Sequence, residues 1–342
     1  MNVLVAMSGG VDSSAAAALL LEAGHDVTGC TMKLWGGASD TGCCSVADVD
    51  DARRVAQQLG IDHFVFSFAD EFETSVVSPY VAEHAAGRTP NPCVECNRSL
   101  KFDRLLRRAQ ALGFDALATG HHARIDHDGT AWRLRRGRDA AKDQSYVLHM
   151  LSQDQLARTL LPVGYLSKAE VRQRATALGL RTAGKPDSQD VCFVTAAAGR
   201  ASFLGERLDL TPGRVVDRTG AEVGRVPAVE LVTIGQRRGL GAAGGERPRY
   251  AIDVDVTSAT VTVGDAGDLL NEEVALAAMS WIDTPAAGDV LAQCSAHGTP
   301  RPATYDAERC VVRFQQPAAR VAPGQSVVLY RGDEVLGGGT AA

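Results

Sequence analysis

Apolar and polar positions alternate with two different periods along the first part of the chain. Short apolar runs predict strands at Asn2–Met7, Asp26–Leu34, His63–Phe68 and Asp115–Thr119. Helical patterns, several of them closed by glycine, predict helices at Ser13–Ala23, Val46–Leu59, Leu100–Leu112 and Lys168–Leu178. This alternation is typical of a parallel sheet covered by helices on both faces. We therefore predict an α/β domain over residues 1–198, with its ligand beyond the carboxyl ends of the strands.

The pattern changes near residue 200, where short β-rich runs separated by Pro and Gly replace the strand–helix alternation. These runs are Arg214–Asp217, Tyr250–Val263, Val274–Ile282, Val290–Ser295, Cys310–Phe314 and Ser326–Tyr330. Many short strands with frequent turn residues are typical of small barrels. We predict a central β-rich domain over residues 205–266 and a β-barrel-like C-terminal domain over residues 267–342.

The composition is that of an ordinary globular protein. The chain has 342 residues, of which 45% are hydrophobic and 22% charged, enough for two or three domains. It has no run of about eighteen apolar residues, so we expect no membrane span. The start, Met1–Met7, lacks the basic region and cleavage site of a secretory signal, and a core strand explains it better. We expect a cytoplasmic protein with no membrane partner.

The basic residues are clustered, although the net charge of −6 argues mildly against a nucleic-acid partner. One helical stretch carries Arg98, Lys101, Arg104, Arg107 and Arg108. The next region, which we predict to be a loop, carries Arg133, Arg135, Arg136, Arg138 and Lys142. Such clusters make a basic surface feasible on an acidic protein. On charge alone, a solvated face is the better explanation.

A glycine-rich turn joins the first predicted strand to the first predicted helix. It runs from Met7 to Ser14 as Met-Ser-Gly-Gly-Val-Asp-Ser-Ser. Two glycines let the backbone approach an anion, and the N–H groups at a helix start are positively polarised. The turn is no Walker P-loop, because no Gly-Lys-Ser/Thr closes it. It resembles the PP-loop of ATP pyrophosphatases, Ser-Gly-Gly-x-Asp-Ser. That resemblance implies cleavage of ATP to AMP and pyrophosphate, with the adenylate passed to a substrate oxygen. From its place in the turn, Asp12 is a candidate Mg²⁺ ligand or a group close to the pyrophosphate.

The chain has eight cysteines. In a reducing compartment these are more often buried, metal-bound or catalytic than paired in structural disulfides. Cys93 and Cys96 form a Cys-x-x-Cys pair on a proline-stiffened loop, ahead of a helix that we predict to start near Arg98 and to favour a thiolate. No second pair of this spacing exists, which argues against a four-cysteine zinc site. We interpret the others, apart from Cys192, as core or loop residues: Cys30, Cys43, Cys44, Cys294 and Cys310.

Cys93, Cys96 and Cys192 suit two kinds of chemistry. In the first, one thiolate carries a sulfane sulfur as a persulfide and another resolves it by forming a disulfide. In the second, three thiolates hold an iron–sulfur cluster that has one open iron. The residues themselves leave both open.

Longer motifs are distributed in order over most of the chain. They are Met7–Ser13, Gly87–Pro92 with Cys96–Arg98, Lys101-Phe102, Thr119–Arg124, Lys142–Tyr146, Cys192-Phe193 and Thr233–Leu240. Together they resemble the bacterial tRNA-specific 2-thiouridylases of the MnmA/TrmU type. The resemblance implies a Rossmann-like PP-loop domain of the adenine nucleotide alpha hydrolase-like type, followed by two small β domains. It also implies a tRNA uridine 2-sulfurtransferase that uses ATP and Mg²⁺.

The resemblance further implies roles for individual residues. ATP would be bound by Ala6, Met7, Ser8, Gly9, Gly10, Val11, Asp12, Ser13, Met32 and Gly120. The wobble uridine of the anticodon loop would be adenylated on its C2 oxygen. Cys192 would carry a persulfide received from a donor such as a cysteine desulfurase or a persulfide relay protein, and Cys96 would be the nucleophile, with a transient disulfide between them. The target base would meet Asn91, Pro92 and Cys93, and tRNA would touch Lys142, Asp143 and Gln144. Extrusion of the base fits this chemistry, since the reacting atom must leave the stack.

Cys93 departs from the family's pattern, because many members have Asp there, with a proposed acid–base role. A cysteine at this position is a third soft ligand beside Cys96 and Cys192, so a 4Fe–4S cluster and a disulfide relay remain equally open. His121 and His122 follow a strand and are expected to point to opposite sides. We predict no metal role for either.

Two rival functions explain less of the sequence. Another PP-loop enzyme, such as an amidating synthetase, would account for Ser8–Ser13 but would leave the three cysteines and the basic stretches without a role. A non-catalytic RNA-binding or sulfur-carrier protein would not need the complete Ser-Gly-Gly-x-Asp-Ser string. AMP release that requires both tRNA and sulfur would exclude the first rival, and pyrophosphate formation would exclude the second.

Overall fold

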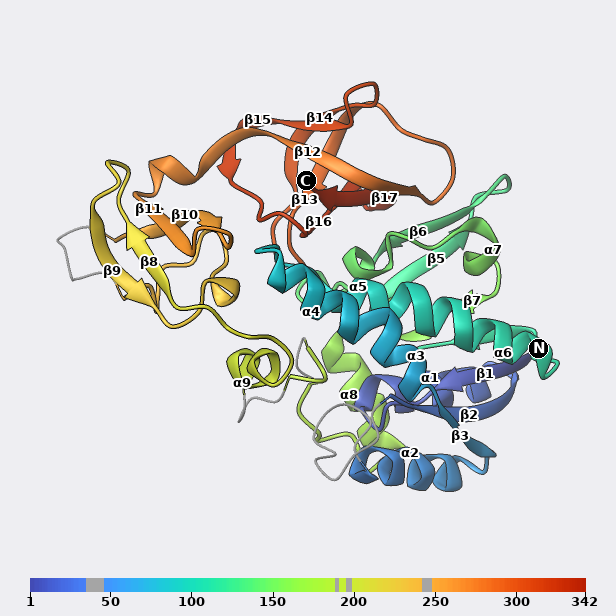
Figure 1. Ribbon diagram of the computed structural model, residues 1–342. Helices are drawn as coiled ribbons and strands as arrows, with labels where there is room; N and C mark the ends of the chain where they lie inside the picture. The colour runs from blue at the N-terminus through green and yellow to red at the C-terminus, as the bar shows by residue number, and fades with distance from the viewer. Residues whose placement is uncertain (35–45, 188–190, 195–198, 242–247) are drawn as a thin grey trace.

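The computed structural model describes residues 1–34, 46–187, 191–194, 199–241 and 248–342 (Figure 1). Its N-terminal part is built on a five-stranded parallel sheet of order β3-β2-β1-β4-β7. The strands are β1 Asn2–Ala6, β2 Asp26–Lys33, β3 His63–Ser67, β4 Ala116–Ala118 and β7 Thr159–Leu160. The predicted parallel sheet is therefore confirmed, and the carboxyl ends of β1, β2 and β4 meet at one edge.

Helices cover both faces of this sheet. Leu4 of β1 belongs to one hydrophobic cluster, whereas Val3 and Val5 belong to another, because successive side chains of a strand point to opposite faces. The Val3/Val5 face is covered by α1 Val11–Glu22, α2 Val46–Leu59 and α8 Lys168–Ala177. The Leu4 face is covered by α3 Ala69–Phe72, α4 Ser78–Ala85, α5 Pro92–Glu95 and α6 Leu106–Ala111, with π-helical turns at Glu73–Val77 and Cys96–Leu105.

The remaining helical elements are short. They are α7 Gln153–Leu156, α9 Gly199–Gly205 and 3-10 turns at Ser145–Leu148, Pro162–Tyr165, Val229–Leu231 and Gly267–Leu269.

One continuous helix runs through α5, the second π-helical turn and α6. Asn91 is its N-cap, because its side-chain oxygen accepts a hydrogen bond from the Cys93 N–H at 3.0 Å. The predicted start near Arg98 is wrong, since Pro92 occupies the first helical position, where proline is favoured. Cys93 therefore lies in the first turn, and Cys96 lies on the same face one turn later.

Two β domains follow the α/β part. The first is a sheet of order β10-β11-β8-β9, formed by β8 Gly213–Val216, β9 Glu222–Val226, β10 Tyr250–Asp255 and β11 Thr260–Gly264. The second contains β12 Leu270–Trp281, β13 Gly288–Gln293, β14 Arg301–Asp306, β15 Val311–Ala319, β16 Ser326–Arg331 and β17 Glu334–Ala341. Because β12 pairs with both β15 and β17, these six antiparallel strands close into a barrel, as predicted. Among the described residues, no helix has the length and apolar character needed to span a membrane.

A hairpin from the first part of the chain adds to the barrel sheet (Figure 1). Its strands β5 (Ala123–His127) and β6 (Trp132–Arg136) pair with each other, and Arg135 of β6 pairs with Glu334 of β17. The prediction of a loop here is wrong. Trp132–Arg136 alternates around the buried Leu134 and so forms a half-buried strand.

The arginines of β6 are compensated within the protein. They form ion pairs between Arg133 and Asp283 at 2.9 Å, Arg135 and Asp333 at 2.9 Å, and Arg136 and Asp143 at 2.9 Å. Asp283 and Asp333 belong to the C-terminal part of the chain. This basic stretch therefore attaches the hairpin to the barrel.

Candidate active site

The turn after β1 has the geometry of an anion-binding loop. Gly9 has a φ of +72°, and a Cβ there would lie 2.3 Å from the Asp48 carbonyl oxygen, so only glycine fits. Gly10 is the N-cap of α1 and supplies no capping side chain, so the first-turn N–H groups are the donors at this end. The Ser13 hydroxyl accepts a hydrogen bond from the Ser8 N–H at 3.1 Å and donates to the Gly10 carbonyl at 3.2 Å. These bonds fix the shape of the turn.

Two other predicted nucleotide-binding residues lie beside this turn. A Cβ on Gly120 would lie 2.6 Å from the Ser13 nitrogen and 2.7 Å from the Asp12 carbonyl carbon, so the segment after β4 packs directly on the start of α1. Met32 is buried near the carboxyl end of β2. The residues predicted to bind ATP thus converge at the carboxyl edge of the sheet, where ligands of such sheets bind.

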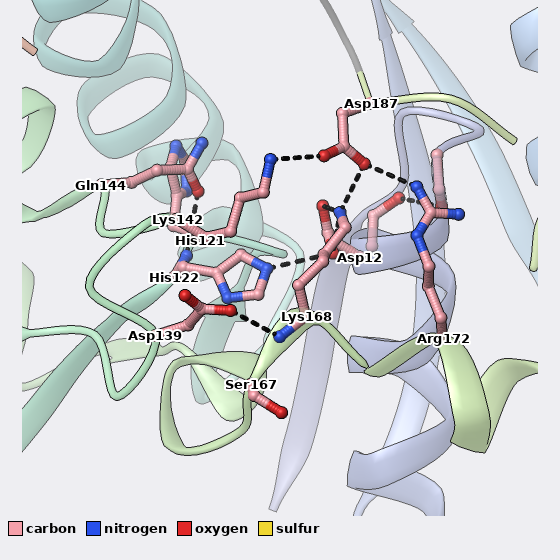
Figure 2. Close-up of polar contacts among 12 residues, drawn as sticks. Asp12, His121, His122, Asp139, Lys142, Gln144, Ser167, Lys168, Arg172 and Asp187 are labelled. Atoms are coloured by element: carbon pink, nitrogen blue, oxygen red, sulfur yellow. Dashed lines mark hydrogen bonds and ion pairs between the residues drawn. The ribbon is translucent and has the colours of Figure 1, made fainter. Parts of the chain in front are cut away.

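Asp12 is the centre of a polar network (Figure 2). Lys168 Nζ lies 2.8 Å from its Oδ1 and 2.7 Å from its Oδ2, and His122 Nε2 lies 3.1 Å from Oδ1. Burial raises the pKa of Asp12, but hydrogen bonds from His122 and Lys168 outweigh burial and leave that pKa below its usual value. Asp12 is therefore a carboxylate at neutral pH, held beside the anion-binding turn.

Asp187 adds a second carboxylate to the network (Figure 2). It accepts from Lys142 Nζ at 2.8 Å, Lys168 Nζ at 2.9 Å and Arg172 Nη2 at 2.7 Å. Burial raises its pKa, but the bonds from Lys142 and Lys168 hold the pKa of Asp187 far below its usual value. Lys168 thus connects the turn to the segment that leads toward Cys192.

Lys185 supports the turn from the side of α2. Its Nζ donates to the Gly9 carbonyl oxygen at 3.0 Å, to Asp48 Oδ1 at 2.6 Å and to Asp51 Oδ2 at 2.9 Å. The Gly9 carbonyl therefore faces Lys185, which leaves the N–H side of the turn for an anion.

Cys96 and Cys192 both lie on the Leu4 face of the sheet. Cys96 is 8% exposed and belongs to the same hydrophobic cluster as Met32. Cys192 packs against this cluster from another segment. The structure thus brings the two predicted sulfur-handling residues to the cluster that also contains a predicted nucleotide-binding residue.

Phe193 attaches the Cys192 segment to the helical layer. Its ring centroid lies within 5.5 Å of three aromatic rings: Phe72 at 5.5 Å, Tyr80 at 5.4 Å and Phe203 at 5.1 Å. Burial raises the pKa of Tyr80, and the Arg200 charge opposes this rise. The aromatic cluster therefore anchors the residue after Cys192 to α3, α4 and α9.

The chain matches three family models that follow one another along the sequence. Residues 1–196 match the tRNA methyl transferase HUP domain, residues 201–265 its PRC-barrel domain, and residues 271–341 the aminomethyltransferase beta-barrel domain. The tRNA-specific 2-thiouridylase MnmA of Roseiflexus castenholzii is 48% identical over 370 residues, which cover 100% of this chain and 99% of that protein. The chain belongs to the MnmA family of tRNA-specific 2-thiouridylases.

Two further MnmA proteins are similar over the full length of the chain. Those of Chloroflexus aurantiacus and Mycolicibacterium paratuberculosis are 47% and 45% identical over 354 and 359 residues, and both comparisons cover 100% of this chain and at least 98% of the relative. The family resemblance predicted from the motifs is confirmed.

The three residues for which the MnmA resemblance implies tRNA contact differ in their surroundings. The Asp143 carboxylate is 6% exposed and accepts from Arg136, the Gly137 N–H and the Ser145 N–H and hydroxyl. Gln144 accepts from the His122 N–H at 2.9 Å and donates its own N–H to the His122 carbonyl. Lys142 is 42% exposed, so it is the member of the three whose charge reaches solvent. The tRNA contact stays a prediction.

The other cysteines take ordinary positions where the structure describes them. Cys30 is fully buried on β2, and burial raises the pKa of its thiol to about 12. Cys294 packs against the barrel core, and burial raises its pKa to about 11. Cys43 and Cys44 lie outside the described residues.

Sequence reasoning missed Lys168, Arg172, Lys185 and Asp187. One local signal for Lys168 was available: Ser167 and Glu170 form a capping box, in which each side chain accepts from the other residue's N–H. That motif places Lys168 at the first position of a helix that follows β7. Its long-range partner Asp12 has no local signal.

Proposed function

We propose that this chain is an ATP-dependent tRNA uridine 2-sulfurtransferase that converts the wobble uridine to 2-thiouridine. One observation carries the proposal. Met32, at the nucleotide edge of the sheet, and Cys96 share one buried cluster, and Cys192 packs against it. This arrangement supports an adenylating site and two sulfur-handling thiols on the same side of the sheet, in a chain whose relatives are named tRNA-specific 2-thiouridylases.

The first step is adenylation. The C2 oxygen of the uridine attacks the α-phosphorus of ATP, a new oxygen–phosphorus bond forms, and the bond to pyrophosphate breaks. The N–H groups at the start of α1 and the Lys168 ammonium counter the negative charge of the phosphates. Ala6–Ser13, Met32 and Gly120 hold the nucleotide. Adenylation turns the carbonyl oxygen into part of a good leaving group, AMP.

The second step delivers sulfur. Cys192 carries a persulfide. Either the terminal sulfur of this persulfide or hydrosulfide released from it attacks C2, and AMP leaves with the former carbonyl oxygen. Cys96 attacks Cys192 Sγ, so the persulfide bond breaks and a Cys96–Cys192 disulfide forms. A thiol reductant then restores both cysteines, and a donor protein such as a cysteine desulfurase or a persulfide relay protein reloads Cys192.

Magnesium fits the site. Asp12 is a partly exposed carboxylate beside the anion-binding turn, and Mg²⁺ is commonly bound by one or two carboxylates together with substrate phosphates. Bound there with ATP, it would neutralise phosphate charge during adenylation.

A 4Fe–4S cluster held by Cys93, Cys96 and Cys192 is the alternative to the persulfide relay. Within the described residues, which include Cys93, Cys96 and Cys192, no group of three His, Cys, Asp or Glu side chains is arranged to hold a metal ion. We therefore route no step through a cluster. Thiolation by a Cys93→Asp variant, in protein purified without oxygen and found free of iron, is the expected result. Loss of thiolation together with loss of stoichiometric iron would reverse this conclusion.

The three parts of the chain have different roles in the proposed reaction. Residues 1–198 carry the chemistry, with Asn91, Pro92 and Cys93 facing the extruded base and Lys142 near the tRNA. Residues 205–266 and 267–342 supply surface for the rest of the tRNA. ATP and tRNA are the substrates, and the cytoplasm is the compartment that holds both.

The proposal is tested with the purified full chain, an unmodified tRNA transcript, ATP and a persulfide donor. Digestion of the tRNA followed by mass spectrometry should reveal 2-thiouridine, with one AMP and one pyrophosphate per sulfur. AMP formation without tRNA, or no thiolated nucleoside, would refute it.

A further inference from the structure

Asp187 is a single carboxylate in contact with three cationic side chains. Lys142, Lys168 and Arg172 all contact it within 2.9 Å. Figure 2 shows Lys142 and Arg172 reaching it from opposite sides, with Lys168 between Asp187 and Asp12. Lys168 and Arg172 both belong to α8, whose N-terminus also lies here. A cluster of this kind is an anion site whose present occupant is a carboxylate.

Two of the three cations are held in place without Asp187. The Lys168 ammonium is bound by both oxygens of Asp12. Arg172 Nη1 donates to the Ala183 and Lys185 carbonyl oxygens at 2.8 Å and 2.9 Å. Removal of the Asp187 carboxylate would therefore leave Lys168 and Arg172 where they are, which is the arrangement of a preorganised site.

Lys142 and Asp187 are the parts of the cluster that an entering ligand can separate. Their side chains are 42% and 35% exposed, against 11% for Lys168. A diphosphate group carries more charge and more acceptor oxygens than one carboxylate, so it competes well for the same three cations.

We propose that Lys142, Lys168 and Arg172 form the pyrophosphate-binding site of this enzyme, and that Asp187 is its built-in competitor. The β- and γ-phosphates of ATP take the three cations from Asp187. After adenylation, Asp187 returns to them and promotes release of pyrophosphate. The inference rests on the proposed ATP reaction and assigns its leaving group to named residues.

If Asp187 competes with the ligand, its replacement changes anion affinity in the opposite direction to that expected for a purely structural ion pair. If Asp187 only stabilised the fold, its replacement would loosen the site and weaken anion binding. If Asp187 competes with the ligand, Asp187→Asn removes one negative charge and should tighten pyrophosphate binding, because no resident anion has to be displaced.

The test is calorimetric titration of the full chain with inorganic pyrophosphate. We expect Asp187→Asn to bind pyrophosphate about tenfold more tightly than the wild type. We expect Lys142→Gln to bind it about tenfold more weakly. The matched control is Asp283→Asn, which removes a carboxylate from an ion pair with Arg133 in the hairpin and should leave the affinity unchanged. In the thiolation assay, Asp187→Asn should also be inhibited by less pyrophosphate.

Unchanged or weaker binding by Asp187→Asn would overturn the inference. So would unchanged binding by Lys142→Gln, an exposed substitution that is available even if the Asp187 variant fails to fold. Either result, with AMP still formed by the wild type, leaves the proposed function standing. Absence of tRNA-dependent AMP formation by the wild type is a separate outcome and sinks the proposed function itself.

Discussion

The ammonium group of Lys168 lies within 2.8 Å of both carboxylate oxygens of Asp12, although 156 positions separate the two residues. The nucleotide turn is therefore completed by α8, a helix that follows the β5–β6 hairpin in the chain. Asp12 is ionised and partly buried, so it depends on this partner.

Lys168→Met should impair adenylation severely. The substitution leaves the Asp12 carboxylate with only His122 and removes a cation from the phosphate site. Loss of one group that stabilises transition-state charge commonly costs about a hundredfold or more in rate, so we expect at least a roughly hundredfold fall in tRNA-dependent AMP release. Arg174→Met on the same helix, which removes an exposed pair with Glu22, is the control. Equal AMP release by the two variants would contradict the account.

Gly120→Ala should abolish ATP binding. A methyl group at this position meets the backbone of Ser13 and Asp12 at 2.6–2.7 Å, and backbone at the start of a helix cannot move aside cheaply. Calorimetry with ATP checks this. The control is Gly184→Ala, which has open space around its Cβ. Wild-type affinity in the Gly120 variant would show that the nucleotide lies elsewhere.

Cys192→Ser and Cys96→Ser should both lose thiolation while retaining ATP and tRNA binding. The first removes the atom that carries sulfur, and the second removes the thiol that resolves the persulfide. Cys310→Ser, a cysteine of the barrel domain, should keep normal activity. The readout is 2-thiouridine in digested tRNA, measured beside binding of both substrates. Thiolation by the Cys192 variant would remove the persulfide from the mechanism.

Stability should fall as the pH drops from about 6.5 to about 4. Burial lowers the pKa of His149 and of His84 from 6.5 to about 4, and for His84 the Arg200 charge adds to this. Between pH 6.5 and pH 4 the unfolded chain binds protons at these histidines that the folded chain excludes, so protonation favours unfolding. Above pH 6.5 both states are neutral at these sites, and the stabilisation is fully present. Urea unfolding at several pH values measures the slope of the free energy of unfolding against pH. His149→Gln should flatten the slope, whereas the exposed His297→Gln should not. An unchanged slope in His149→Gln would contradict the burial argument.

The sequence predicted the parts of this structure that local pattern controls. β1, α1 and β2 follow from apolar periodicity, and Gly9 and Gly10 follow from the demands of a tight anion-binding turn. The helix start at Pro92 was missed because two nearby prolines indicated extended chain, whereas Asn91 caps a helix. The hairpin around Leu134 was missed because its arginines dominate the local pattern. Their partners, such as Asp333, come from the far end of the chain.

The residues of the site show the same division between those that local motifs reveal and those that only long-range packing brings together. Ser8–Ser13, Cys96 and Cys192 carry recognisable motifs. The contacts of Asp12 with Lys168, and of Asp187 with Lys142, depend on how α8 and the segment after it pack on the turn. No spacing along the chain encodes such pairs.

The central claim, activation of the uridine C2 oxygen by ATP, has one direct measurement. A tRNA is prepared with a heavy oxygen isotope at C2 of the wobble uridine and incubated with the chain, ATP and a persulfide donor. The account predicts that each AMP released carries the heavy oxygen in its phosphate, in equal number to the 2-thiouridine formed. AMP without the label, beside normal thiolation, would contradict it.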